Sequence, residues 1–285
     1  MRRTLSSDDF KRVNDLVGRP DSDRVVNGTV FPDSACWVCR DYEIRGEHIV
    51  ATERSDNVEH WSLFFPLEDA PDLFLRFSRL CKEPDFVKAA LTFARRFGLP
   101  AGDANSDRHK DRAESLPIAH FLRESRRAWA TLTLYECVLT GDDAAAREIF
   151  AAHREDDDLF REVSDALEHQ PPGLECHHAL WVAATIPYSM VERLCSQKLY
   201  MQVAGRSRPD PSWIKLTWEF DNVLGAMYLQ MHQLVVAGGN VSRCENCQRI
   251  ISLAPPRPGR RRPRKDKRFC DDACRQAHHR SKKKA

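Results

Sequence analysis

The C-terminal part of the sequence reads Cys244-Glu245-Asn246-Cys247 and, after 22 intervening residues, Cys270-Asp271-Asp272-Ala273-Cys274. A Cys-x-x-Cys turn directs both sulfur atoms at one ion, and two cysteines four residues apart share one face of the first turn of a helix. Two such pairs suit a closed tetrahedral site with Zn–S bonds of about 2.3 Å. The sequence therefore predicts that Cys244, Cys247, Cys270 and Cys274 bind one Zn²⁺, as a structural rather than a catalytic ion.

Two other interpretations of these cysteines stay open. They are four unrelated thiols in a reducing compartment, or His278, four residues after Cys274, replaces one of them as a ligand. The order of turn, loop and helix is that of a treble-clef finger. A segment this short buries little apolar surface, so a bound ion would be needed to hold the turn against the helix.

A strongly basic loop separates the two cysteine pairs. The formal net charge of the chain is +2, but residues 243–285 hold 15 Lys or Arg against 4 Asp or Glu, a net of +11, which leaves −9 for the rest. A cationic loop and helix held in place by a metal are typical of a surface that contacts phosphate. Asp271 and Asp272 fit the first turn of that helix. The residues expected to contact nucleic acid are Arg260, Arg261, Arg262, Arg264, Lys265, Arg275 and Arg280.

The expected partner of this module is nucleic acid, with DNA favoured over RNA. The helix fits a major groove, with Arg275 or Gln276 near base edges. Phe269 is the only aromatic residue of the module, which disfavours a base-stacking platform for single strands. Two alternatives remain: a solvated basic tail, and a basic surface that binds an acidic protein partner or the acidic body of the same chain.

The C-terminal module resembles the finger of bacterial, largely actinobacterial, CGNR-type zinc-finger proteins. The resemblance rests on Cys244-x-x-Cys247, Arg268-Phe269-Cys270, Cys274-Arg275 and His279-Arg280, and it extends upstream to Met227-Tyr228-Leu229-Gln230. It covers about 60 residues well and the rest loosely. The sequence departs from the tetrad that names the family, because it has Cys274-Arg275-Gln276-Ala277. The resemblance implies a helical N-terminal domain of unestablished activity in front of a finger that binds DNA.

The rest of the chain is expected to be mainly α-helical, with a small β element. Residues 24–66 contain short β-like pieces separated by turn residues such as Asn27-Gly28 and Arg45-Gly46. We predict an α-rich regulatory or interaction domain over residues 1–238 and the finger over residues 239–285. Pro187 is expected to kink or divide the helix that contains it. The helical patterns cover residues 10–17, 69–81, 85–97, 119–139, 142–153, 157–170, 174–204 and 213–237.

Other groups of polar residues carry weaker signals. Cys36-Trp37-Val38-Cys39 is a second Cys-x-x-Cys, which we interpret as two half-buried residues at a strand turn, with a redox pair or a metal site as alternatives. Cys176-His177-His178 lacks the spacing that places two ligands on one helix face. The run Glu155-Asp156-Asp157-Asp158 is expected to cap a helix rather than to bind magnesium.

These patterns favour a non-enzymatic regulator. Phosphate-binding loops and nucleophile elbows are absent from the sequence, and the His and Asp residues around the finger do not fit the HNH nucleases that share a treble-clef scaffold. The first residues do not form a signal peptide, and the uncharged run over residues 222–242 contains polar residues that suit a buried helix, so a cytoplasmic location is expected. We expect a transcriptional or stress-related regulator; the alternative is a protein-interaction adaptor.

Overall fold

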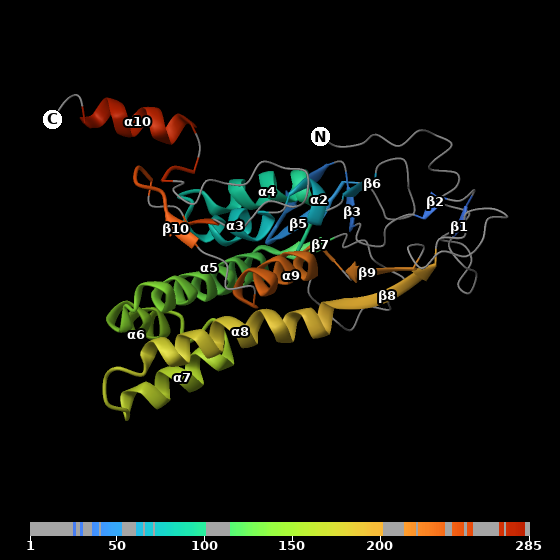
Figure 1. Ribbon diagram of the computed structural model, residues 1–285. Helices are drawn as coiled ribbons and strands as arrows, with labels where there is room; N and C mark the ends of the chain where they lie inside the picture. Colours follow the sequence, from blue (N-terminus) through green and yellow to red (C-terminus); the bar gives the residue numbers. More distant parts are fainter. Residues whose placement is uncertain are drawn as a thin grey trace. The chain divides into compact units, whose positions relative to one another are not determined.

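The computed structural model describes residues 25–26, 29–30, 36–39, 41–52, 61–64, 66–70, 72–100, 115–201, 214–220, 222–236, 241–247, 250–252, 268–270 and 272–282. Over these residues the protein is mainly α-helical with small antiparallel sheets, as the sequence predicts (Figure 1). The chain forms two compact units, one of residues 1–71, 87–121 and 190–229 and the other of residues 72–86, 122–189 and 230–285. This division does not follow the boundary at 238/239, which stays a prediction.

The short strands expected between residues 24 and 66 are present in the first unit. Strands β4 (Tyr42–Arg45) and β5 (His48–Ala51) form a hairpin in which Tyr42 pairs with Ala51. Gly46 occupies the turn with a φ of 58°, a left-handed conformation that glycine adopts without strain. Strand β7 (Ser115–Pro117), which the sequence patterns did not predict, extends this sheet beside β5. The other strands between residues 24 and 66 form two pairs: β1 (Val25–Val26) with β2 (Thr29–Val30), and β3 (Cys36–Cys39) with β6 (Trp61–Phe64).

Helix α4 (Phe86–Phe97) provides much of the apolar packing of the first unit. Phe97 lies against Phe64 with ring centroids 5.6 Å apart, and Phe93 meets Phe121 edge to face at 5.9 Å. Arg95 ties the same helix to the β4 region through an ion pair with Asp41 at 2.8 Å.

The expected helix over residues 69–81 is divided into three pieces: α2 (Pro66–Asp69), α3 (Leu73–Ser78) and the 3₁₀ turn η2 (Leu80–Lys82).

The second unit contains most of α5 (Ile118–Thr140) and α8 (Glu175–Leu194), together with α6 (Asp143–Ala152) and α7 (Asp158–Glu168). These helices begin close to the residues that the sequence predicts. Asp142 caps α6 by accepting a hydrogen bond from the Ala145 N–H at 3.0 Å, and Asp157 caps α7 in the same way from Leu159 at 2.9 Å. The acidic run that precedes α7 therefore acts as a helix cap, as expected.

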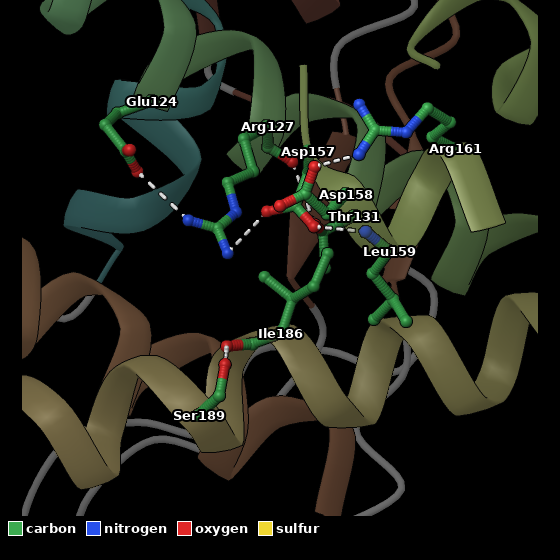
Figure 2. A network of polar contacts seen from close by, with 9 residues as sticks. All are labelled: Glu124, Arg127, Thr131, Asp157, Asp158, Leu159, Arg161, Ile186 and Ser189. Carbon is green, nitrogen blue, oxygen red and sulfur yellow. Dashed lines mark hydrogen bonds and ion pairs between the residues drawn. The ribbon is translucent and has the colours of Figure 1, made fainter. Parts of the chain in front are cut away.

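A partly buried polar network joins α5 to the start of α7 (Figure 2). Arg127 on α5 contacts the Asp157 carboxylate at 2.6 Å and the Glu124 carboxylate at 3.8 Å, and the three side chains are at most 15% exposed. Next to it, Asp156 pairs with Arg126 at 3.1 Å and with His153 at 2.5 Å. Burial lowers the pKa of His153, although the hydrogen bond to Asp156 opposes that shift.

The prediction of helical structure over residues 174–204 and 213–237 is wrong in part. Helix α8 continues through Pro187 but ends at Leu194, and residues 195–201 form strand β8 (Cys195–Met201). It pairs with β9 (Ile214–Phe220) in a seven-residue antiparallel ribbon (Figure 1). Helix α9 (Val223–Val236) follows and is buried as expected over most of its length, with Gln233 and Val236 exposed near its end. Within the part of the chain that the structure describes, no helix has both the length and the apolar character that crossing a membrane requires.

Candidate metal centre

The first two cysteines of the site lie at the turn of a small hairpin. Strands β10 (Val241–Arg243) and β11 (Ile250–Ser252) pair antiparallel, with Arg243 opposite Ile250. Cys244 follows β10 directly and is fully buried, and Cys247 closes the turn with its side chain half-buried. The Cys-x-x-Cys turn is therefore held by a ladder of backbone hydrogen bonds, which fixes the direction of both sulfur atoms.

The other two cysteines lie at the start of α10 (Asp272–Lys282). Cys274 is in the first turn of this helix, and Cys270 lies two residues before it. Cys270 is thus outside the helix, whereas the sequence pattern had placed both residues of this pair on its first turn. Asp272 occupies the first turn as expected, where a carboxylate complements the partial positive charge of the helix end.

The structure brings the four sulfur atoms together. The Sγ atoms of Cys244, Cys247, Cys270 and Cys274 all lie within 4.8 Å of one another, and those of Cys247 and Cys270 are 3.7 Å apart. Four sulfurs bound tetrahedrally at about 2.3 Å would be separated by about 3.8 Å along each edge. The cluster therefore has the size and the ligand chemistry of a metal-ion site. His278 does not belong to it; its ring lies against Phe269 with centroids 5.2 Å apart.

The environment favours one thiolate over its neighbours. Burial raises the pKa of the Cys244 thiol, but backbone N–H groups, led by those of Cys247 and Cys270, outweigh burial and bring it to about 6. The pKa of Cys270 is raised by burial and by its hydrogen bonds with the neighbouring thiols. Since a metal ion binds the thiolate form, its binding would release protons from the cluster.

Groups around the sulfur atoms hold the two halves of the site together. The Asn246 side-chain amide donates to the Cys274 Sγ at 3.6 Å. Glu245 makes three hydrogen bonds with Arg268: its N–H donates to the Arg268 carbonyl at 3.0 Å, and its carboxylate accepts from both Nε and Nη2 of the guanidinium. These contacts join the turn of the first cysteine pair to the residues that directly precede the second pair. The sequence pattern did not predict this contact between Glu245 and Arg268.

The hairpin is also attached to the helical part of its unit. Arg243, the last residue of β10, forms a bidentate ion pair with Glu136 on α5, with Nε–Oε1 and Nη2–Oε2 distances of 2.7 and 2.5 Å. Two parallel N–H···O bonds fix orientation better than a single contact. The finger is therefore anchored to α5 by a residue that directly precedes its first cysteine.

The predicted nucleic-acid contacts fall into two groups. Arg275 and Arg280 are exposed on α10, and Arg275 pairs with Asp272 at 3.1 Å. The others lie outside the described residues, as does Asp271: Arg260, Arg261, Arg262, Arg264 and Lys265.

The second Cys-x-x-Cys is not a turn. Cys36 and Cys39 are both buried within strand β3, and residues three apart on a strand point to opposite faces of the sheet. Their side chains are therefore directed apart, which disfavours a redox pair or a shared ion. The Cys176-His177-His178 group also makes structural contacts. The Cys176 N–H donates to Asp143 at 2.8 Å, and His178 Nε2 lies 3.0 Å from the Gln170 side-chain oxygen.

Comparison of the chain with protein-family models, with curated proteins and with solved structures gave no match.

Proposed function

We propose that this chain is a non-enzymatic regulator that binds nucleic acid, DNA in preference to RNA, through a zinc-dependent C-terminal finger. One observation carries the proposal: an exposed cationic helix face is built directly on the four-cysteine cluster. Arg275, Gln276, His279 and Arg280 are exposed and share one side of α10, here named the α10 outer face. Cys274 and His278 lie on the other side, toward the cluster.

The ligand set favours zinc. Thiolates select Zn²⁺, Cu(I) or iron–sulfur clusters among biological metals, and a mononuclear tetrahedral site with four sulfurs is the usual structural zinc arrangement. With all four positions filled by cysteine, the ion would have no open position for substrate, so its role is to hold the hairpin and α10 together. This arrangement supports the expectation of a treble-clef finger in a cytoplasmic protein and agrees with the resemblance to CGNR-type fingers.

The proposed contacts divide between the helix and the loop that it closes. Arg280 on the α10 outer face would contact phosphate, and Arg275 or Gln276 would reach base edges in a major groove. The residues 260–265 would add phosphate contacts. Arg275 would have to exchange Asp272 for nucleic acid, and this is feasible because both side chains of that ion pair are solvent-exposed.

The zinc part of the proposal is tested by measuring metal content with mass spectrometry on the wild-type chain and on Cys270→Ser. The expected result is one zinc per wild-type chain and loss of that zinc in the variant, because three thiolates and one hydroxyl bind the ion far more weakly. Cys81→Ser is the matched control, since Cys81 lies outside the cluster, and should keep the zinc. A wild-type chain without metal would contradict the proposal.

The nucleic-acid part is tested by duplex binding at several salt concentrations. Wild-type affinity should fall steeply with salt, and Arg280→Ala should reduce the slope of log K against log[salt] by about 1 for the phosphate contact that it loses. Arg193→Ala, an exposed arginine on α8, should leave the slope unchanged. A zinc-loaded wild-type chain that binds neither duplex nor single strand would refute this part while leaving the zinc site intact.

A specific observation favours a second candidate, an adaptor whose finger binds acidic protein surfaces. Three arginines of the finger region already pair with carboxylates: Arg243 with Glu136, Arg268 with Glu245 and Arg275 with Asp272. Competition separates the candidates. A regulator that reads DNA should prefer one duplex over scrambled competitors, whereas an adaptor should show no preference among them.

A further inference from the structure

Helix α8 exposes a row of large apolar side chains. Trp181 is 50% exposed, Tyr188 49% and Leu174, which directly precedes the helix, 42%. These three residues are seven apart, and His177 and Ala184 fall between them at spacings of three and four. We name Leu174, His177, Trp181, Ala184 and Tyr188 the α8 stripe.

The α8 stripe is separate from the packing that holds α8 in its own unit. The opposite side of the helix is buried through Ala179, Val182, Ala183 and Ile186. Tyr188 lies against His232 of α9, with ring centroids 5.9 Å apart, so its ring is held in place at the surface. A helix that is apolar on two sides, one of them exposed with the 3/4 spacing of helix–helix contacts, indicates a second packing partner.

We propose that the α8 stripe is the interface between two copies of this chain, paired through antiparallel α8 helices. The size pattern is the first reason. Trp181 and Tyr188 are the two exposed aromatic residues of α8, and smaller residues lie between them, with Ala184 and Thr185 on either side of the midpoint. A two-fold axis at that midpoint places Trp181 of each subunit opposite Tyr188 of the other, so the contact occurs twice. The smaller residues at the centre let the helices approach closely, and the aromatic side chains on either side fill the space.

Charge complementarity is the second reason. His177 and Glu192, both exposed, lie at equal distances from the same midpoint, so each imidazole would face a carboxylate of the other copy and would carry the positive charge of that pair in its protonated form. Antiparallel pairing also sets the positive end of one helix dipole beside the negative end of the other. The chain as a whole has a formal net charge of only +2, so two copies repel each other weakly.

A further reason rests on the proposed function. A single finger presents one short helix to nucleic acid, and small single modules read only a few base pairs. A two-fold pair of chains would supply two fingers to one site, as dimeric DNA-binding proteins do.

The proposal is tested by sedimentation velocity on the full chain, without nucleic acid, so that its failure is separate from any failure of nucleic-acid binding. The wild-type chain should sediment as a dimer of 32.8 kDa subunits at micromolar concentration. Trp181→Glu should raise the dimer dissociation constant by about tenfold or more, as loss of a central aromatic contact does. Leu139→Glu is the matched control, because Leu139 is similarly exposed but lies on α5, and it should remain dimeric.

A wild-type chain that stays monomeric, or a Trp181→Glu variant that dimerises as well as wild type, would overturn the proposal. Tyr188→Glu provides a second variant if Trp181→Glu does not fold. Charge exchange tests the antiparallel register directly: His177→Glu should weaken the dimer by placing two carboxylates together, and the added change Glu192→Lys should restore it. Failure of the double variant to recover would contradict this register.

Discussion

Helices α7 and α10 have the same length, 11 residues, but differ in how much side-chain surface they bury. Helix α7 buries Phe160, Val163 and Leu167 and begins at a side-chain cap. In α10, Cys274 and His278 are half-buried and the rest of the described side chains are exposed. Short helices are marginal in water without tertiary packing, so α10 needs another source of stability. Apolar burial accounts for the stability of α7, whereas we propose that metal ligation at the four-cysteine cluster stabilises α10.

Metal removal is the change with the largest expected effect on this comparison. A chelator should unfold α10 while α7 keeps its structure, because structural zinc sites supply about 10–16 kcal/mol of binding free energy to the segments they join. Hydrogen exchange followed by mass spectrometry measures both helices in one sample. Amides of residues 272–282 should exchange fast after chelation and those of residues 158–168 should stay protected. Equal protection of α10 with and without metal would show that packing alone holds it.

The substitution Phe160→Ala is expected to have the opposite effect to metal removal: it should destabilise the packing of α7 and leave the metal site unchanged. Phe160 is fully buried and packs against Phe150 of α6 with ring centroids 6.1 Å apart. Removing this ring should destabilise the chain by about 3–5 kcal/mol in denaturant unfolding, through lost transfer free energy and the cavity left behind. Metal content should not change, since the ring is remote from the four cysteines in sequence and packing. A variant that also lost its metal would show that the finger depends on the α6–α7 packing.

The same contrast explains how much of the structure was predictable. The boundaries of α6 and α7 follow from local signals: an acidic cap, apolar residues at helical spacing and, after α7, Pro171-Pro172-Gly173. The four cysteines were predictable because their spacing is also local. The contact of Glu245 with Arg268 was not predictable, because it joins two residues that are separated by 22 others along the chain.

Strands β8 and β9 show where hydrophobic periodicity fails to predict secondary structure. Cys195–Met201 continues the apolar pattern of α8, and Ile214–Phe220 leads into the apolar pattern of α9, so each appeared to extend a helix. What makes them strands is their pairing with each other across the intervening residues 202–213, a non-local interaction that overrides helical propensity. Pro187 is the converse case, where a local helix breaker lies within α8 because the rest of the helix is packed.

The smallest effect that sharpens the comparison concerns Asp157, which has two functions at the start of α7. Its carboxylate accepts from the Leu159 N–H and pairs with Arg127 on α5 (Figure 2). Asp157→Ala removes both interactions and should lower the free energy of unfolding by about 2 kcal/mol, whereas Asp157→Asn keeps an N-cap acceptor and should cost about 1 kcal/mol.

Denaturant unfolding of both variants, beside Asp158→Asn, separates these contributions. Asp158 pairs with Arg161 at the surface, with a side chain that is 81% exposed, and its loss should change stability by less than about 1 kcal/mol. If Asp157→Asn proves as costly as Asp157→Ala, the charge on Asp157 matters more than the cap, and α7 is attached to α5 chiefly by its ion pair. If Asp157→Asn matches Asp158→Asn instead, the cap dominates and the two 11-residue helices differ mainly in the apolar area that they bury.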